Sequence, residues 1–235
     1  MAAKKIDVSI KENLEKIKEQ IGNNNVKIIA VTKYAGDDQI LEAYKLGINN
    51  FGESYVQNAL RKISDKCINF NNVNWHFIGR LQKNKVKFVV GRFFLVHSTD
   101  SKELATLINK TALKLNHIQN ILLQVNISQE ASKTGFSEEE LKDSFGELVQ
   151  LSNVKILGLM TIAPKTSEGG ILRSTFLKLR AIKDELNKKH LAKAKTNMNE
   201  LSMGMTDDYK IALECGSTMI RIGRALFNEG YNKEA

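Results

Sequence analysis

The spacing of hydrophobic residues changes repeatedly along the chain. Over residues 6–21, isoleucine and leucine recur three or four positions apart, which predicts an amphipathic helix that ends near Gly22. The next apolar run, residues 26–32, is short and rich in β-branched residues, as expected of a buried strand. Asp37 follows as the expected N-cap of a helix over residues 38–46. This alternation of a strand with a helix continues to the end of the chain.

Eight short apolar segments have the length and composition of strands, and each precedes a segment with helical spacing. The expected strands are residues 26–32, 47–51, 75–78, 93–97, 120–127, 154–160, 199–202 and 218–222. The expected helices between them are residues 38–46, 53–63, 81–90, 101–115, 137–151, 172–186 and 207–214, and a short terminal helix follows. Ser137 and Glu140 form an expected capping box.

Eight strand–helix units in 235 residues predict an α/β protein, a closed (β/α)8 barrel of the TIM type with an extra N-terminal helix. An open, doubly wound sheet of the same elements is the alternative. No linker divides the chain, and residues 164–170 are only a loop, so we expect residues 1–235 to form a single domain.

Composition narrows the class of protein. With 42% hydrophobic and 26% charged residues and a single proline, the chain is typical of an ordered globular protein. No apolar run approaches the roughly 18 to 20 residues of a membrane span. Residues 1–7 contain Lys4 and Lys5 rather than the apolar core of a signal peptide. We therefore expect a cytoplasmic protein that does not bind membranes.

Charge and metal-ligating residues exclude further classes. The formal net charge of +9 attracts anions, including nucleic acids and phosphorylated small molecules. The densest basic run, residues 183–195, lacks aromatic residues that could stack on bases, so we expect a solvated helix end and no nucleic acid partner. Cys67 and Cys215 are far apart and the four histidines are scattered, so neither a disulfide nor a metal site is expected.

Candidate chemistry lies at the expected strand ends, where barrels of this class carry their sites. Lys33 follows the first strand directly, so its amine is expected in the barrel mouth, where it could form a Schiff base. A strand-end lysine that simply extends into solvent is the alternative. Ser202 and Gly204 end the expected seventh strand, and Gly223 and Arg224 follow the eighth. A hydroxyl, backbone N–H groups and a cation suit a phosphate, so the expected ligand is a carbonyl-bearing phosphate ester such as pyridoxal 5′-phosphate.

Seven short motifs, taken in order, resemble those of a known family. They are Val31-Thr-Lys33, Phe51-Gly-Glu53, Trp75-His-Phe-Ile-Gly79 with Leu81-Gln82 and Asn84-Lys85, Ser132-Lys-Thr-Gly135, Gly158-Leu-Met160, Leu201-Ser-Met-Gly-Met205 and Arg221-Ile-Gly223. The family is YggS/PROSC, also called pyridoxal phosphate homeostasis proteins, and the resemblance covers residues 6–228. It implies a barrel like the N-terminal domain of alanine racemase, which binds pyridoxal 5′-phosphate as an internal aldimine and has no established catalysis.

The resemblance also implies roles for individual residues. Lys33 matches the lysine that forms the Schiff base. Ser202, together with the backbone of Gly223 and Arg224, matches the cup that holds the phosphate. No residue is assigned a catalytic role.

Arg221 matches the arginine that faces the pyridine nitrogen of the cofactor. A cation there disfavours protonation of the ring and weakens its ability to stabilise a carbanion. Met160 resembles a residue that packs on the ring, and a methionine of the core is the alternative. Two positions depart from the family pattern: Ser54 replaces an asparagine, and Asn228 after Phe227 replaces a glycine.

The leading hypothesis is therefore a non-catalytic, monomeric carrier that acts in vitamin B6 and amino-acid homeostasis and passes pyridoxal 5′-phosphate to apoenzymes. The alternative is a small racemase or lyase that uses this cofactor. Such an enzyme needs a second acid or base in the mouth, and the candidates are Tyr34, Tyr55 and His76, for each of which a structural role is the alternative. The related racemase takes this group from an additional domain, for which we expect no room before Ala235.

Overall fold

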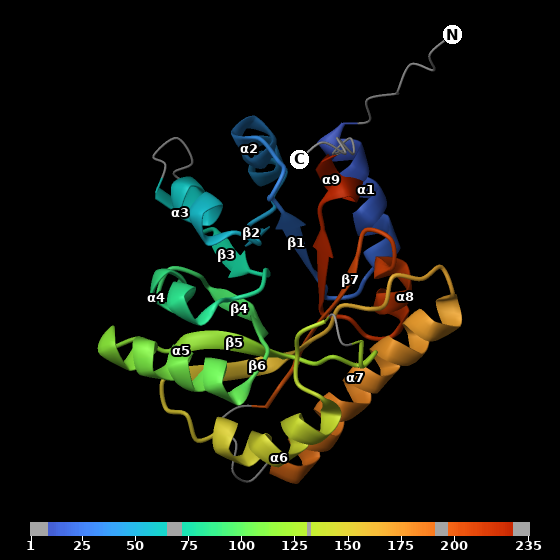
Figure 1. The fold of residues 1–235 in the computed structure, drawn as a ribbon. Helices are drawn as coiled ribbons and strands as arrows, with labels where there is room; N and C mark the ends of the chain where they lie inside the picture. The colour runs from blue at the N-terminus through green and yellow to red at the C-terminus, as the bar shows by residue number, and fades with distance from the viewer. Residues whose placement is uncertain (1–8, 65–71, 131–132, 191–196, 228–235) are drawn as a thin grey trace.

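The computed structural model describes residues 9–64, 72–130, 133–190 and 197–227, and its strands form a closed parallel barrel (Figure 1). The strand order is β1-β2-β3-β4-β5-β6-β7-β8. Strand β1 pairs in parallel with β2 on one side and with β8 on the other. The predicted (β/α)8 class is confirmed, and the doubly wound alternative is wrong because the sheet has closed on itself.

Helices surround the strands on the outside (Figure 1). The strands are β1 (Lys27–Val31), β2 (Asn50–Glu53), β3 (Asn74–Phe77), β4 (Leu95–Thr99), β5 (Gln119–Gln124), β6 (Val154–Met160), β7 (Glu200–Met205) and β8 (Met219–Ile222). The helices are α1 (Ile10–Ile21), α2 (Asp37–Lys45), α3 (Val56–Ser64), the 3-10 turn η2 (Lys83–Lys85), α4 (Val86–Val89), α5 (Lys102–Lys114), α6 (Glu138–Leu148), α7 (Gly169–His190), α8 (Tyr209–Glu214) and α9 (Arg224–Phe227).

Local signals place several helix ends correctly. Ser137 Oγ accepts a hydrogen bond from the backbone N–H of Glu140 at 3.1 Å, and the Glu140 carboxylate accepts one from Ser137 N at 2.8 Å, which confirms the capping box. The predicted N-terminal helix is α1, which ends at Ile21 with Gly22 as its C-cap; residues 6–8 of that prediction lie outside the described residues. Asn13 on α1 donates to the Leu226 carbonyl at 3.1 Å, so this extra helix packs beside α9.

The predicted start of α2 is wrong by one residue. Gly36, with extended backbone angles, is the N-cap, and its N–H donates to the side chain of Gln39 at 3.0 Å. Asp37 is instead the first helical residue and forms a bidentate ion pair with Arg61 at 3.0 and 3.1 Å. At the first helical position, Asp37 lies at the positive end of the helix dipole, where a carboxylate is favourable.

Strand β2 begins three residues later and ends two residues later than the prediction. Gly47 has a φ of 91° and belongs to the turn after α2, so the strand begins only at Asn50. Glu53, which was predicted to begin a helix, is the last residue of β2. Strand β7 likewise extends to Met205, three residues beyond its predicted end.

The described residues of the barrel form two separate apolar regions. A large one lies between the strands and the surrounding helices. A small one consists of Ile29, Leu95, Leu122, Met160 and Met219, which come from five different strands and are at most 1% exposed. Side chains from five strands can meet in this way only inside the barrel. The fully buried polar side chains of His76, His97 and Ser202 also meet across three strands, which is unusual for an interior normally filled by branched apolar residues.

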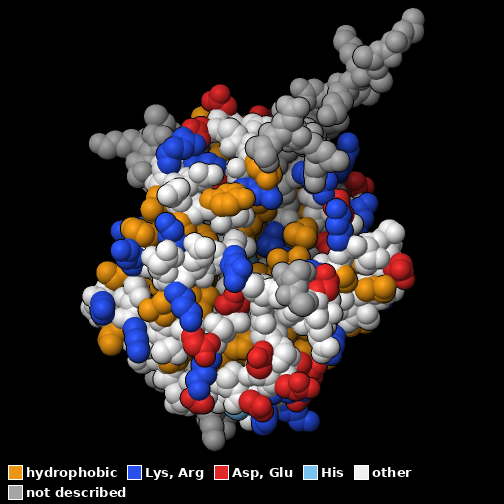
Figure 2. Space-filling model, viewed as in Figure 1, with side chains coloured by type: hydrophobic (Ala, Val, Ile, Leu, Met, Phe, Trp, Pro, Cys, Tyr) orange, Lys and Arg blue, Asp and Glu red, His pale blue; other side chains and the backbone are white. Residues whose placement is uncertain are grey.

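Basic residues are spread over the surface. Figure 2 shows Lys and Arg side chains mixed with Asp and Glu rather than gathered in one patch on the face in view. The basic run predicted as a solvated helix end begins on α7, where Lys188 and Lys189 are exposed; residues 191–195 lie outside the described residues. In the described part of the chain, no helix has the length and apolar character needed to cross a membrane.

Candidate functional site

Lys33 lies in the turn that follows β1, at the carboxyl end of the strands. The residue is half-buried, and its Nζ lies 4.8 Å from the centre of the Tyr34 ring. The Tyr34 side chain is largely exposed. Lys33 is thus held against an aromatic ring at the open end of the barrel, as a cation–π pair.

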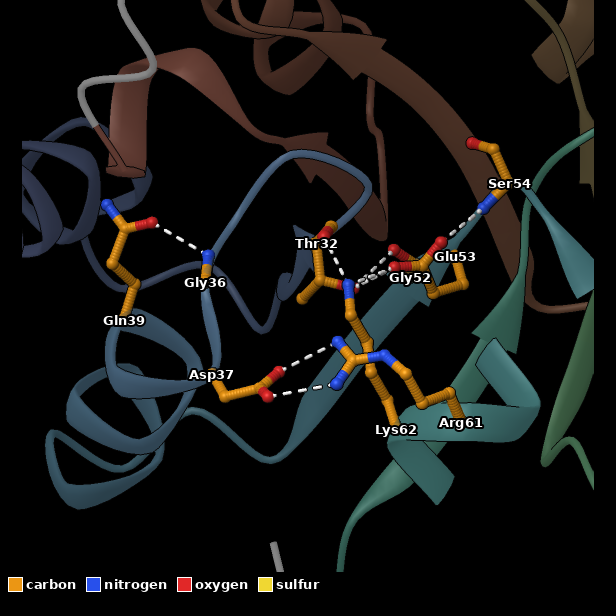
Figure 3. A network of polar contacts seen from close by, with 9 residues as sticks. All are labelled: Thr32, Gly36, Asp37, Gln39, Gly52, Glu53, Ser54, Arg61 and Lys62. Carbon is orange, nitrogen blue, oxygen red and sulfur yellow. Dashed lines mark hydrogen bonds and ion pairs between the residues drawn. The ribbon is translucent and has the colours of Figure 1, made fainter. Parts of the chain in front are cut away.

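A buried polar cluster fixes the backbone next to Lys33, as Figure 3 shows. Thr32 Oγ1 donates to the Glu53 carboxylate at 2.8 Å, and Thr32 N donates to the Gly52 carbonyl at 3.0 Å. Lys62, on α3, donates from Nζ to the Thr32 carbonyl and to Glu53 Oε1, both at 2.6 Å. Strand β2 and helix α3 together therefore hold the residue that precedes Lys33.

This cluster contains a buried ion pair. The side chains of Lys62 and Glu53 are 4% and 0% exposed, and the second carboxylate oxygen accepts from Ser54 N at 3.1 Å. Glu53 is part of a family-like motif in the sequence, but neither residue was predicted to belong to the site. A signal existed for Lys62, because it lies three residues after Ala59 on the buried face of α3. Lysine at such a position is rarely buried unless it is paired.

Arg221 and Ser202 come together as predicted neighbours, but inside the barrel rather than at its rim. Arg221 is 5% exposed and donates from Nη1 to the carbonyl and the hydroxyl oxygens of Ser202 at 2.8 and 2.7 Å. Its Nη2 donates to the Thr161 carbonyl at 2.9 Å. Burial lowers the pKa of Arg221 to about 10, so the group remains a cation at neutral pH.

The predicted position of Ser202 at a strand end is therefore wrong. Strand β7 continues for three more residues, which leaves Ser202 fully buried. The hydroxyl at this rim belongs to Thr206, which directly follows β7. Thr206 Oγ1 accepts from Ala225 N at 3.4 Å, so it lies beside Gly223 and Arg224 at the start of α9. A prediction that β7 ends at Met205 would have placed Thr206 at the rim.

Two other predicted rim groups have structural partners. Gly204 has a φ of 93°, and a Cβ there would lie 2.6 Å from that of Ala212, so this glycine allows α8 to pack on β7. The Arg224 side chain pairs with Asp207 at 2.5 Å.

Met160 packs in the small interior cluster and is 1% exposed, as the alternative of a core methionine expects. His76, one of the three candidate acids or bases, is fully buried within the barrel, so its predicted location in the mouth is wrong. Burial lowers the pKa of His76 to about 3 and keeps it neutral. Tyr34 and Tyr55 are exposed. Among the described residues, no cluster of His, Cys, Asp and Glu could hold a metal ion.

The fold and these residues define a class of protein: a (β/α)8 barrel with a lysine after its first strand and an arginine on its last. A family model of the alanine racemase N-terminal domain matches residues 8–230. An alanine racemase from Clostridium difficile has the same fold, with a TM-score of 0.74 at 16% identity over 97% of this chain and 61% of its own.

More similar proteins narrow the class. A pyridoxal phosphate homeostasis protein of Aquifex aeolicus is 41% identical over 88% of this chain and 89% of its own. The structure of PipY from Synechococcus elongatus with pyridoxal phosphate bound is 33% identical, with a TM-score of 0.85 over 93% of this chain and 100% of that chain. The chain belongs to the family of pyridoxal phosphate homeostasis proteins.

Proposed function

We propose that this protein binds pyridoxal 5′-phosphate through a Schiff base to Lys33 and serves as a carrier in vitamin B6 homeostasis. The observation that carries this proposal is the place of Lys33 at the end of β1, which pairs with β8, the strand of Arg221. The names of the relatives and the bound ligand of PipY support the same chemistry. When bound, the cofactor supplies an aldehyde and an electron-withdrawing ring.

The rim between β7 and β8 suits the phosphate. Thr206 offers a hydroxyl there, and the backbone N–H groups of Gly223 and Arg224 follow β8 directly. Donors of this kind form charge-assisted hydrogen bonds to an anion. We assign the hydroxyl of the cup to Thr206 in place of Ser202, because the Ser202 hydroxyl already has two buried partners.

The proposal of a carrier rather than an enzyme rests on Arg221. Its cation would disfavour protonation of the pyridine nitrogen and so limit carbanion chemistry. Arginine at this place does not by itself prevent racemisation, and the exposed Tyr34 and Tyr55 keep a small racemase or lyase as the second candidate. Lys33 is only half-buried and lies beside the exposed Tyr34, so a cofactor bound to it would be accessible to another protein. We therefore propose apoenzymes as partners that receive the cofactor.

The direct test is to locate the lysine that holds the cofactor. We expect borohydride treatment of the protein with pyridoxal 5′-phosphate to fix a pyridoxyl group on Lys33, as peptide mass mapping would show. Lys33→Ala should abolish this label, and Lys87→Ala, which removes an exposed lysine on α4, should retain it. A label found mainly on another lysine would overturn the assignment.

A further inference from the structure

A chain of hydrogen-bonded side chains crosses the barrel interior behind the proposed cofactor site. It links Arg221 (β8), Ser202 (β7), His97 (β4), His76 (β3) and Asn50 (β2), and we call it the interior relay. Its successive distances are 2.7 Å from Arg221 Nη1 to Ser202 Oγ, 2.9 Å from Ser202 Oγ to His97 Nδ1, 2.9 Å from His97 Nε2 to His76 Nδ1, and 3.1 Å from His76 Nε2 to Asn50 Oδ1. The first four of these side chains are at most 5% exposed.

The two ends of the interior relay fix its direction. Arginine can only donate, so the Ser202 oxygen accepts from Arg221 and its proton is available to His97. At the other end, Asn50 Oδ1 can only accept, and Asn50 Nδ2 is already directed to Asn49 Oδ1 at 2.7 Å. A neutral histidine has one donor and one acceptor nitrogen. In each hydrogen bond of the relay, the donor is therefore the residue nearer to Arg221 and the acceptor is the residue nearer to Asn50.

This direction assigns the protons of both histidines. His97 accepts at Nδ1 and, being neutral, carries its proton on Nε2, from which it donates to His76 Nδ1. His76 in turn carries its proton on Nε2 and donates to Asn50. Burial lowers the pKa of both histidines, that of His97 further through the nearby His76 and Arg221, so the neutral forms are those present at pH 7.

We propose that His97 is a positioning residue that acts through Ser202 to hold the Arg221 guanidinium in place for the cofactor ring, and that His76 fixes the tautomer of His97. Because the Ser202 hydroxyl donates a hydrogen bond to His97, its oxygen becomes a stronger acceptor for Arg221, and each hydrogen bond polarises the next. The aligned dipoles stabilise a cation that is buried inside the barrel. The role of Arg221 towards the ring rests on the proposed function, whereas the relay itself does not.

The first test needs no cofactor. Long-range 1H–15N correlation spectra of the free protein at pH 7 should show both His76 and His97 as neutral Nε2–H tautomers. Ser202→Ala should move the His97 ring signals, while Ser217→Ala, which removes another buried serine hydroxyl that bonds to backbone carbonyls, should leave them in place. A charged imidazole, or an Nδ1–H tautomer of His97, would overturn the relay.

The second test asks whether the relay serves the cofactor site. Asparagine at position 97 can place an oxygen near the position of Nδ1, whereas glutamine extends its amide towards the position of Nε2. We expect His97→Asn to bind pyridoxal 5′-phosphate with an affinity within about twofold of the wild type. The absorption maximum of the bound cofactor should stay within a few nanometres of the wild-type value. His97→Gln and Ser202→Ala should weaken binding about tenfold, in line with loss of a hydrogen bond to a charged group, and should shift the absorption band.

Equal loss of affinity in His97→Asn and His97→Gln, or no change in Ser202→Ala, would overturn the positioning role. Urea unfolding of each variant checks that the barrel is intact, and Ser217→Ala again supplies the matched control. Failure of the wild-type protein to bind pyridoxal 5′-phosphate would refute both the proposed function and the positioning role. The tautomer result would then still decide whether the relay exists.

Discussion

Lys33 and Lys62 lie near the same strand end in different surroundings. Lys33 faces the ring of Tyr34 at the open end of the barrel, whereas Lys62 donates to Thr32 and Glu53 in the buried cluster. A lysine whose amine is bonded to a carboxylate and a carbonyl is a poor nucleophile for an aldehyde. The contrast therefore supports Lys33 as the reactive amine, and it indicates that Lys62 stabilises the backbone at the end of β1.

The adjacent residues Arg61 and Lys62 allow a matched comparison of ion pairs. We expect Lys62→Met to lower the free energy of unfolding by about 3 to 5 kcal/mol, because it leaves the Glu53 carboxylate buried and uncompensated. Arg61→Met should lower it by about 1 kcal/mol or less, since Arg61 and Asp37 are 56% and 42% exposed. Urea unfolding measures both values. Equal losses in the two variants would contradict the structural role given to Lys62.

His76 makes stability depend on pH. Its pKa is about 3 in the folded protein because it is buried, whereas an unfolded histidine has a pKa of about 6.5. Between these two pH values, His76 binds a proton in the unfolded state but not in the folded state. The contribution of His76 to the free energy of unfolding is therefore complete above pH 6.5 and falls as the pH decreases. The slope is at most about 1.4 kcal/mol per pH unit for this residue.

Urea unfolding at pH 7, 6 and 5 tests this dependence. His76→Gln should show a shallower fall in stability than the wild type, and His117→Gln, which removes an exposed histidine, should follow the wild-type curve. Parallel curves for the wild type and His76→Gln would show that His76 does not contribute.

At the scale of elements, the ends of β7 and β8 decide which groups reach a ligand. The three residues by which β7 exceeds its predicted length move Ser202 into the interior and leave Thr206 at the rim. Gly204 permits this course of the chain, because its positive φ and missing Cβ let α8 pack closely on the strand. The length of one strand thus selects the hydroxyl of the proposed anion site.

We expect Thr206→Ala to weaken the binding of pyridoxal 5′-phosphate about tenfold and to leave the weaker binding of pyridoxal unchanged, because a hydrogen bond to a charged group is lost. Thr206→Ser, which keeps the hydroxyl, should restore most of the affinity. Spectroscopic titration with the two vitamers measures these effects. An equal loss for both vitamers would place the phosphate elsewhere.

For the molecule as a whole, the barrel combines an accessible amine at its mouth with a buried cation inside it. In the proposed function, this combination would favour exchange of the cofactor and of amino acids at Lys33 over abstraction of an α-proton. The two histidines of the interior relay are buried and have each other, Ser202 and Asn50 as partners, so they are not available as bases for a substrate.

We therefore expect added amino acids to change the absorption spectrum of the loaded protein without exchange of their α-hydrogen at an enzyme-like rate. NMR in heavy water with several L-amino acids measures this exchange. Turnover of about 1 per second or faster that disappears in Lys33→Ala would favour the racemase or lyase alternative.

Much of the architecture can be predicted from the sequence because its signals are local. The bounds of β6 match the predicted residues 154–160, and the Ser137 capping box marks the start of α6. Periodicity within a window of a few turns decides such elements, and eight of them in series leave few topologies other than a barrel. Lys33 could be placed at the mouth for the same reason, because it directly follows the first strand.

Only the tertiary structure decided which side chains meet. Glu53 pairs with Lys62 because β2 ends beside α3, and His97 meets Ser202 across the barrel although 105 positions separate them in the chain. No local pattern marks such partners, since closing the barrel brings them together. The sequence by itself therefore determined the class of fold and the place of Lys33 after the first strand, whereas barrel closure decided the interior relay and which hydroxyl lies at the rim.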